Sequence, residues 1–206
     1  MDTKRFLKKP LMGIVRGVSA DVIEPLTECV ISAGLETIEI TMNTEGAPGL
    51  IKKCRNKAGG RLAVGAGTVL GMKSLKEALA AGASFIVTPV LVPDVMKYCV
   101  KNRIPVFPGA LTPSEVYKAW NSGAFMVKVF PSGFFGPAYF SELKGPFDDI
   151  KLLACGGVRP ENMEEYIKAG ADAVSFGASV FSRARLIAGD FTAIKTLVSK
   201  YVENIG

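Results

Sequence analysis

The chain of 206 residues contains no histidine. This absence excludes sites built on imidazole, such as histidine metal ligands, serine–histidine triads and histidine general bases. Acid–base chemistry must therefore use carboxylate, lysine or tyrosine side chains, or water. We expect neither a metal site nor a bound cofactor.

Cysteine is also scarce, and Cys29, Cys54, Cys99 and Cys155 are far apart in the sequence. This spacing fits neither a disulfide framework nor a zinc site, and it favours reduced thiols in a cytoplasmic protein. No segment reaches the roughly 18 apolar residues of a membrane span. The first residues also lack the apolar core of a signal peptide. We therefore expect a cytoplasmic protein without membrane contact.

The positive charge is modest, with a net value of +6 and its densest run at residues 52–61. A basic run without interleaved aromatic residues is typical of a solvated helix face, and it argues against nucleic-acid binding. A mildly basic protein still attracts anionic small molecules. The sequence thus favours a small anionic substrate.

Short apolar runs recur along the whole chain, and segments with helical spacing separate them. This alternation predicts an α/β protein with βαβ units and a parallel sheet. Eight units favour a (β/α)8 TIM barrel, as a single domain over residues 1–206 with an extra N-terminal helix at residues 2–9. The predicted strands are Met12–Val15, Thr37–Ile40, Leu62–Val64, Phe85–Val87, Pro105–Phe107, Phe125–Val129, Lys151–Ala154 and Ala173–Phe176.

An internal repeat supports the barrel. A small residue followed by glycine recurs before every second strand, where a helix should end in a left-handed residue. The other strands are predicted to end in glycine-rich loops. The repeated glycines are Gly34, Gly82, Gly123 and Gly170, and the loops are residues 65–68, 108–110 and 156–157.

Lys128 lies in the middle of the sixth predicted strand, in the segment FMVKVFPSG. Alternation along a strand puts Met126 and Phe130 on its face. By itself the pattern fits an edge-strand lysine that faces water. It also fits an amine in an apolar pocket, where burial lowers its pKa and makes it nucleophilic toward carbonyls. A closed barrel has no exposed edge, so we favour the second interpretation.

Glu39 belongs to the second predicted strand, TIEIT. Alternation turns Glu39 and Thr41 toward the barrel axis and the intervening isoleucines toward the helices. Glu39 and Lys128 would then face each other, either as a structural ion pair or as catalytic groups. Because sites in such barrels lie at the C-terminal ends of the strands, we predict Lys128 and Glu39 to be catalytic.

Two further residues follow strand ends and could bind an anion. Arg16, after the first strand, is either solvent-facing or a bidentate partner for a carboxylate. Thr68, after the third strand, could bind the same carboxylate and also cap the next helix. Pro89 and Phe130 would form apolar walls around Lys128.

Two glycine loops follow the seventh and eighth strands, with Gly156 and Gly157 in one and Gly177 and Ser179 in the other. In barrels these loops commonly bind phosphate through backbone N–H groups. Each could also be a simple turn. Cys155, beside the first loop, is interpreted as an incidental small residue.

The segments IEITMNT, GAGTVL, FIVTPV, FPGALTP, VKVFPSG and CGGV, with a later asparagine, follow in this order between Gly13 and about Phe181. This set resembles the 2-keto-3-deoxy-6-phosphogluconate (KDPG) and 4-hydroxy-2-oxoglutarate (KHG) aldolases. The resemblance implies a homotrimeric class I aldolase on a (β/α)8 barrel. It implies Lys128 as the Schiff-base lysine, Glu39 as the acid–base group and Thr68 as the ligand of the pyruvate carboxylate. It also implies phosphate binding at Gly156, Gly157, Gly177 and Ser179.

The sequence departs from the gluconate-type pattern at two positions. Asn43 stands where many gluconate-type members carry arginine, and Cys155 stands where the family usually has threonine. The segments around Arg16 and Asn43 look like the 6-phosphogalactonate branch, with Arg16 as the substrate arginine. The implied reaction releases pyruvate and glyceraldehyde 3-phosphate from a 2-keto-3-deoxy-6-phospho sugar acid, and the resemblance extends to cleavage of 4-hydroxy-2-oxoglutarate.

Two other interpretations remain open at this point. One is a phosphate-binding barrel isomerase or epimerase that uses Glu39 and Lys128 for proton transfer without an imine. The other is a non-catalytic barrel that senses a phosphorylated acid.

Overall fold

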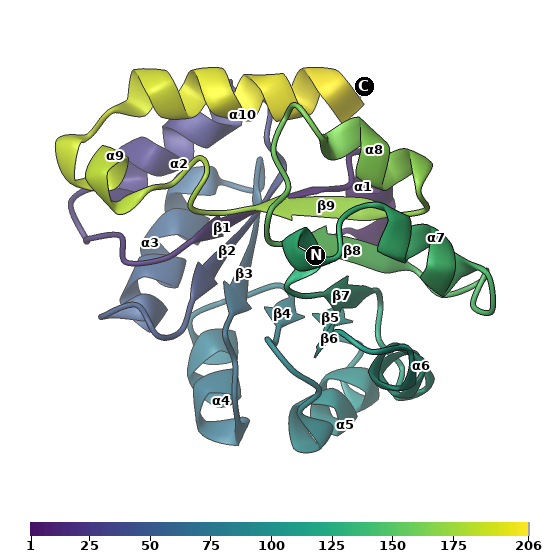
Figure 1. Cartoon of the computed structure of the whole chain (residues 1–206). Coiled ribbons are helices and arrows are strands. Elements are labelled where there is room, and N and C mark those ends of the chain that lie inside the picture. Colours follow the sequence, from purple (N-terminus) through teal and green to yellow (C-terminus); the bar gives the residue numbers. More distant parts are fainter. Residues whose placement is uncertain (206) are drawn as a thin grey trace.

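A computed structural model describes residues 1–205 and shows nine strands around a common axis with helices outside them (Figure 1). The strands are β1 (Leu11–Val15), β2 (Thr37–Thr41), β3 (Ala63–Gly67), β4 (Ile86–Val87), β5 (Val106–Phe107), β6 (Gly109–Ala110), β7 (Val127–Val129), β8 (Leu152–Cys155) and β9 (Ala173–Phe176). The helices are α1 (Thr3–Lys8), α2 (Ile23–Ser32), α3 (Ala47–Ala58), α4 (Met72–Ala80), α5 (Pro93–Lys101), α6 (Pro113–Asn121), α7 (Ala138–Lys144), α8 (Met163–Lys168), α9 (Arg183–Ala188) and α10 (Phe191–Ile205), with a 3-10 turn η1 (Ser132–Phe134). Within residues 1–205, no helix has both the length and the apolar character that crossing a membrane requires.

The sheet closes into a barrel. Its strand order is β5-β4-β3-β2-β1-β9-β8-β7-β6, and the paired strands are parallel. The two end strands, β5 and β6, are halves of one segment interrupted at Pro108, so the ends of the sheet meet. Lys128 N donates to Pro108 O at 2.9 Å across this junction. The predicted (β/α)8 barrel is confirmed, with its fifth strand split in two.

Two of the predicted glycine loops are wrong, because residues 65–67 lie in β3 and Gly109–Ala110 form β6. Glycine is needed there for close packing. A Cβ on Gly65 would lie 2.4 Å from ring atoms of Phe85, and one on Gly109 would lie 2.1 Å from Pro89 O. Glycine inside a strand often marks such a close approach.

The predicted glycine repeat is confirmed. Gly34, Gly82, Gly123 and Gly170 have φ angles of 85°, 92°, 89° and 103°. They follow α2, α4, α6 and α8, so the left-handed residue ends every second helix of the barrel.

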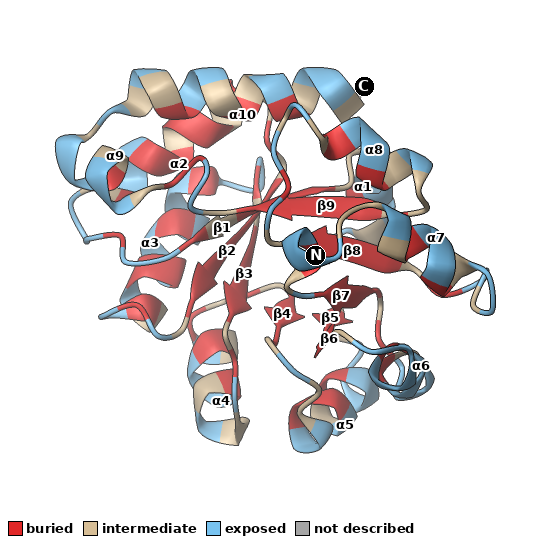
Figure 2. Ribbon diagram, viewed as in Figure 1, coloured by how far each residue is buried: buried red, intermediate tan, exposed pale blue. Residues whose placement is uncertain are grey.

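Apolar side chains fill the N-terminal end of the barrel. Helix α1, predicted at residues 2–9, inserts Phe6 there, and its ring lies edge-on to Phe107 with centroids 5.6 Å apart. Figure 2 shows the strands buried, while the outer faces of the helices are exposed. The interior cluster consists of Phe6, Met12, Phe85, Val87, Phe107, Met126, Leu153 and Ala173.

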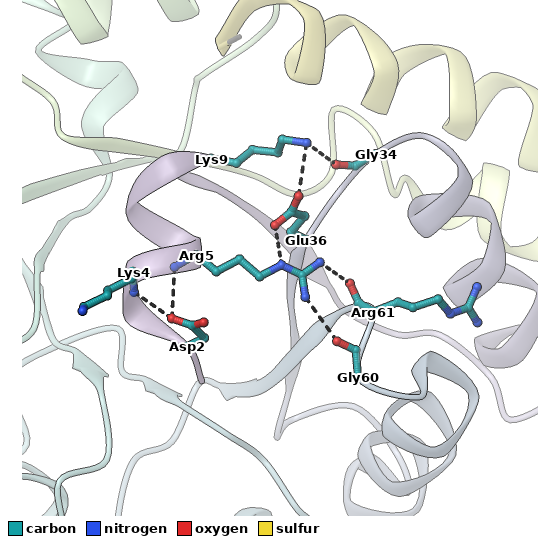
Figure 3. Close-up of polar contacts among 8 residues, drawn as sticks. All are labelled: Asp2, Lys4, Arg5, Lys9, Gly34, Glu36, Gly60 and Arg61. Carbon is teal, nitrogen blue, oxygen red and sulfur yellow. Dashed lines mark hydrogen bonds and ion pairs between the residues drawn. The ribbon is translucent and has the colours of Figure 1, made fainter.

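Polar contacts hold α1 in place (Figure 3). The Arg5 guanidinium donates to the Glu36 carboxylate at 2.6 Å and to the backbone oxygens of Gly60 and Arg61 at 3.2 and 2.7 Å. Lys9 Nζ lies 3.3 Å from the second Glu36 oxygen. These contacts tie α1 to the loops before β2 and β3, so α1 closes the N-terminal end of the barrel.

Candidate active site

Lys128 is central in β7 and only 7% exposed. It is paired on both sides, with Gly109 of β6 and Leu153 of β8, so it is not an edge residue. Met126 lies in the interior cluster, and the ring centroid of Phe130 lies 5.2 Å from Lys128 Nζ. The interpretation of a buried, inward-facing lysine is therefore confirmed.

Glu39 of β2 is 1% exposed, and its carboxylate lies against β3. A Cβ on Gly67 would lie 2.4 Å from Glu39 Oε1, so the carboxylate occupies the space that a side chain would fill. Among residues 1–205, Glu39 Oε2 is buried and has no hydrogen-bond partner. Ile38 and Ile40 belong to the core between the sheet and the helices, as predicted.

Glu39 and Lys128 influence each other's pKa without forming a direct ion pair, since the ion pairs within 4.0 Å in residues 1–205 do not include them. Burial raises the pKa of Glu39, and the charges of Lys128 and Arg16 oppose that shift. Burial lowers the pKa of Lys128, but Cys155 and Glu39 outweigh it and hold this pKa above its ordinary value. The predicted lowering of the Lys128 pKa is wrong, because the pocket supplies these two polar neighbours.

Cys155 ends β8 and is 3% exposed. Leu153 is the register partner of Lys128, and Cys155 lies two residues further on the same inward face. Its thiol raises the pKa of Lys128. The register between β7 and β8 thus makes Cys155 a polar neighbour of the amine, while its interpretation as an incidental residue stays a prediction.

A cavity of about 1230 Å³ opens at the C-terminal ends of β1, β8 and β9. It brings together Arg16, which directly follows β1, with Phe130 and Cys155 near the lysine. Both predicted glycine loops line it, through Gly156, Gly157, Gly177 and Ser179.

Arg159 and Arg183 also line this cavity, and neither is among the site residues predicted from the sequence. A usable signal existed, because each arginine follows one of the two predicted glycine loops within a few residues. Asn162 supports the first loop, with Nδ2 donating to Gly157 O at 3.1 Å and Oδ1 accepting from Arg159 N at 2.7 Å. Arg185 supports the second loop by donating to Ser179 O at 2.8 Å.

Thr68 and Pro89 lie apart from the large cavity. Thr68 follows β3 with φ 54°, a conformation that costs a non-glycine residue about 1–3 kcal/mol and clusters at functional sites. It does not cap the next helix, because α4 begins at Met72 after Gly71, so that alternative is wrong. Pro89 lines a smaller cavity of about 310 Å³ that also includes Phe130. The structure thus places Thr68 outside the cavity that holds Arg16.

A buried lysine and a buried carboxylate, below an arginine-lined cavity at the mouth of a (β/α)8 barrel, define an enzyme that acts on small molecules. The model of one family, KDPG and KHG aldolase, matches residues 3–197, and the chain belongs to this family. The protein is therefore an aldolase, a carbon–carbon lyase.

Individual relatives agree with the family. The chain is 32% identical over 199 residues to 2-dehydro-3-deoxy-6-phosphogalactonate aldolase of Escherichia coli (strain K12), covering 96% of this chain and 97% of the relative. It is 30% identical over 183 residues to 2-dehydro-3-deoxy-phosphogluconate aldolase of Treponema pallidum (strain Nichols), covering 88% and 87%. A solved structure described as native KDPGal superposes with a TM-score of 0.89 at 31% identity, covering 95% of this chain and 93% of that one.

Proposed function

We propose that the protein is a class I aldolase that cleaves a 2-keto-3-deoxy-6-phospho sugar acid to pyruvate and glyceraldehyde 3-phosphate. The observation that carries this proposal is the buried Lys128 on the barrel axis, with the buried Glu39 as its charged neighbour. A lysine in such a place can form an imine with a ketone, and the imine then acts as an electron sink.

Imine formation needs a free amine. Because the pKa of Lys128 is raised, the ammonium must first lose a proton. Glu39 accepts this proton through a bridging water, because the two groups lie more than 4.0 Å apart. Burial raises the pKa of Glu39, and its Oε2 atom has no partner among the described residues. The amine attacks the C2 ketone, and protonated Glu39 returns the proton to the carbinolamine hydroxyl, which leaves as water. Glu39 is then a carboxylate again.

Bond cleavage uses the same two groups. Glu39 removes the proton of the C4 hydroxyl, directly or through a water, and the C3–C4 bond breaks as its electrons move into the iminium. The aldehyde leaves, Glu39 protonates C3 of the enamine, and hydrolysis of the imine releases pyruvate. Each proton taken by Glu39 is returned, so the cycle balances without a further acid or base.

The remaining predicted residues position the substrate in this proposal. Arg16 would hold the carboxylate from the large cavity, and Thr68 would reach it from the end of β3, outside that cavity. Pro89 and Phe130 form the apolar walls of the lysine pocket. The backbone N–H groups of the two glycine loops hold the phosphate. Support comes from the large cavity, which both loops and Arg16 line. The loop residues are Gly156, Gly157, Gly177 and Ser179.

Among the substrates of the family, we propose the galactonate configuration, with 4-hydroxy-2-oxoglutarate as a slower substrate. Asn43 in place of an arginine and the 32% identical galactonate-type relative support this choice. The test is pyruvate release, coupled to lactate dehydrogenase, from both C4 epimers with and without the 6-phosphate. We expect the phosphorylated galactonate epimer to give the highest kcat/KM. Absence of pyruvate from every compound would refute the proposal.

We further propose that the protein is a single-domain homotrimer in the cytoplasm. Phe134 and Phe135, just after β7, are 86% and 56% exposed, which is typical of surfaces that pack against another chain. The four cysteines are free thiols, which suits a reducing compartment. Light scattering after gel filtration should give three times the mass of the chain.

A further inference from the structure

Three arginines of the large cavity have no side-chain partner in the part of the chain that the structure describes. Arg16, Arg159 and Arg183 line it, and Glu45 is the one acidic residue among the lining residues described. Within residues 1–205, none of the three guanidinium groups lies within 4.0 Å of a carboxylate or donates a hydrogen bond to a protein atom. The cavity therefore carries uncompensated positive charge.

The other arginines with polar contacts serve the fold. Arg5 pairs with Glu36, Arg61 pairs with Glu28, and Arg185 donates to backbone oxygens. Arg159 and Arg183 are exposed and make no such contacts in the described chain. Their guanidinium groups are thus free to contact a ligand.

Both side chains start beside the loops that are proposed to hold the phosphate. Arg159 lies two residues after Gly157, in a turn in which the Asn162 side chain hydrogen-bonds to the backbone of both residues. Arg183 lies four residues after Ser179, at the start of α9. A phosphate monoester carries about −1.5 to −2 charges at neutral pH, which neutral backbone N–H groups do not balance. Arginine forks match phosphate oxygens in geometry as well as in charge.

We propose that Arg159 and Arg183 determine the selectivity of the site for a substrate that ends in a dianionic phosphate. The glycine loops would accept any anion of suitable size, and the two arginines supply the charge that favours the phosphate monoester over a neutral or monoanionic end. This inference rests on the proposed function of the same site. It adds two specificity residues and leaves the catalytic roles of Lys128 and Glu39 unchanged.

A binding experiment tests the inference without turnover. Isothermal titration calorimetry would measure the dissociation constant of glycerol 3-phosphate for three proteins. These are the wild type, the double variant Arg159→Gln/Arg183→Gln, and Lys76→Gln. Lys76→Gln removes one unit charge, as each of the two Arg→Gln substitutions does, from an exposed position on α4 outside the cavity. We expect the double variant to weaken binding at least about tenfold, because charge-assisted hydrogen bonds are lost. The Lys76→Gln control should stay within about twofold of the wild type.

Equal binding by the wild type and the double variant would overturn the inference, and so would no binding by the wild type. A double Arg→Lys variant keeps the charge without the planar fork, and we expect it to bind with intermediate affinity. Circular dichroism should show the same fold for all variants, since both arginines are exposed.

Steady-state kinetics separates this inference from the proposed function. In the double variant we expect the KM of the phosphorylated keto acid to rise about tenfold with kcat little changed, because the lost contact is far from the reacting bond. The constants for the unphosphorylated acid should not change. A wild type that cleaves the phosphorylated acid, with an unchanged KM in the double variant, would refute the inference and leave the function standing. A wild type without lyase activity would refute the function, and the titration would still decide the inference.

Discussion

The carboxylate of Glu39 lies directly against Gly67, so that a Cβ at position 67 would be 2.4 Å from Glu39 Oε1. Oε2 has no hydrogen-bond partner among residues 1–205. The missing side chain of Gly67, together with burial, therefore sets where this carboxylate can lie. The position of Glu39, the proposed acid–base group, thus depends on a glycine in the neighbouring strand β3.

Replacing Gly67 with alanine should displace Glu39 and leave the fold intact. The clashing atoms belong to the end of a flexible side chain, which can move. Because a displacement of about 1 Å can cost a hundredfold in rate, we expect kcat to fall about 10- to 100-fold. The melting temperature should change little.

Gly65→Ala is the matched control, because its Cβ would meet the Phe85 ring in the packed interior at 2.4 Å. Such overpacking typically costs about 1–3 kcal/mol of unfolding free energy. Activity loss should therefore dominate at position 67 and stability loss at position 65. Normal kcat in Gly67→Ala would contradict the placement of Glu39 at the reacting atoms.

Glu39→Gln should separate imine formation from turnover. Glutamine keeps the size of the side chain and removes the proton acceptor, so we expect kcat to fall by about 10² to 10⁴. Imine formation with pyruvate should persist, although more slowly, at a pH high enough to deprotonate Lys128, with water in place of Glu39 as the acid that protonates the leaving hydroxyl. Stopped-flow and trapping measurements on the same preparation check both points. Full turnover would show that another group is the base.

Cys155→Ala should move the pH dependence of imine formation to lower pH. The pKa of Lys128 is lowered by burial and raised by Cys155 and Glu39, with a net increase. Removing the thiol removes one upward influence, so the free amine should become available at a lower pH than in the wild type. The rate of pyruvate trapping as a function of pH measures this shift. An unchanged or upward-shifted profile would show that Cys155 does not act on the amine.

Glu36→Gln should lower the free energy of unfolding in a pH-dependent way, because Glu36 pairs with Arg5 and Lys9 and so holds α1 against the barrel. Burial raises the pKa of Glu36, but hydrogen bonds from Arg5 and Lys9 outweigh it and hold this pKa low. The stabilisation is therefore fully present above the unfolded-state pKa of about 4.3 and is lost as pH falls through the folded value. Because the pair is partly exposed, we expect a loss of about 0.5–1 kcal/mol at neutral pH and none in strong acid.

Chemical denaturation at several pH values measures this difference. Glu164→Gln is the control, since Glu164 and Lys168 form an exposed pair with 71% of each side chain accessible. If the loss of unfolding free energy in Glu36→Gln persists unchanged in acid, packing and not the ion pair holds α1.

The barrel was predictable because its repeats are periodic. Ala173–Phe176 has the predicted bounds, and the glycines before β2, β4, β7 and β9 adopt the predicted left-handed conformation. Gly65 and Gly109 lie in strands and not in the predicted loops, because their role depends on which side chain or carbonyl faces them from the next strand. That information is in the packing between strands and not in the local pattern.

The sequence predicted which strand residues face the site, but not the contacts that depend on neighbouring strands and loops. Strand alternation correctly turned Glu39 and Lys128 inward. The direction of the Lys128 pKa was wrong because it depends on Cys155, which the register with β8 brings alongside. Arg159 and Arg183 were missed because the direction of a side chain that follows a loop depends on the loop conformation, which hydrogen bonds such as those from Asn162 determine.

Borohydride reduction in the presence of pyruvate tests the central claim most directly. If Lys128 forms the imine, reduction should inactivate the enzyme and add one pyruvate-derived mass to the peptide that contains Lys128, as found by mass spectrometry after digestion. Lys128→Ala should give no adduct, although the chain has many other lysines. An adduct on another lysine, or no adduct in an enzyme that cleaves its substrate, would contradict the Schiff-base mechanism.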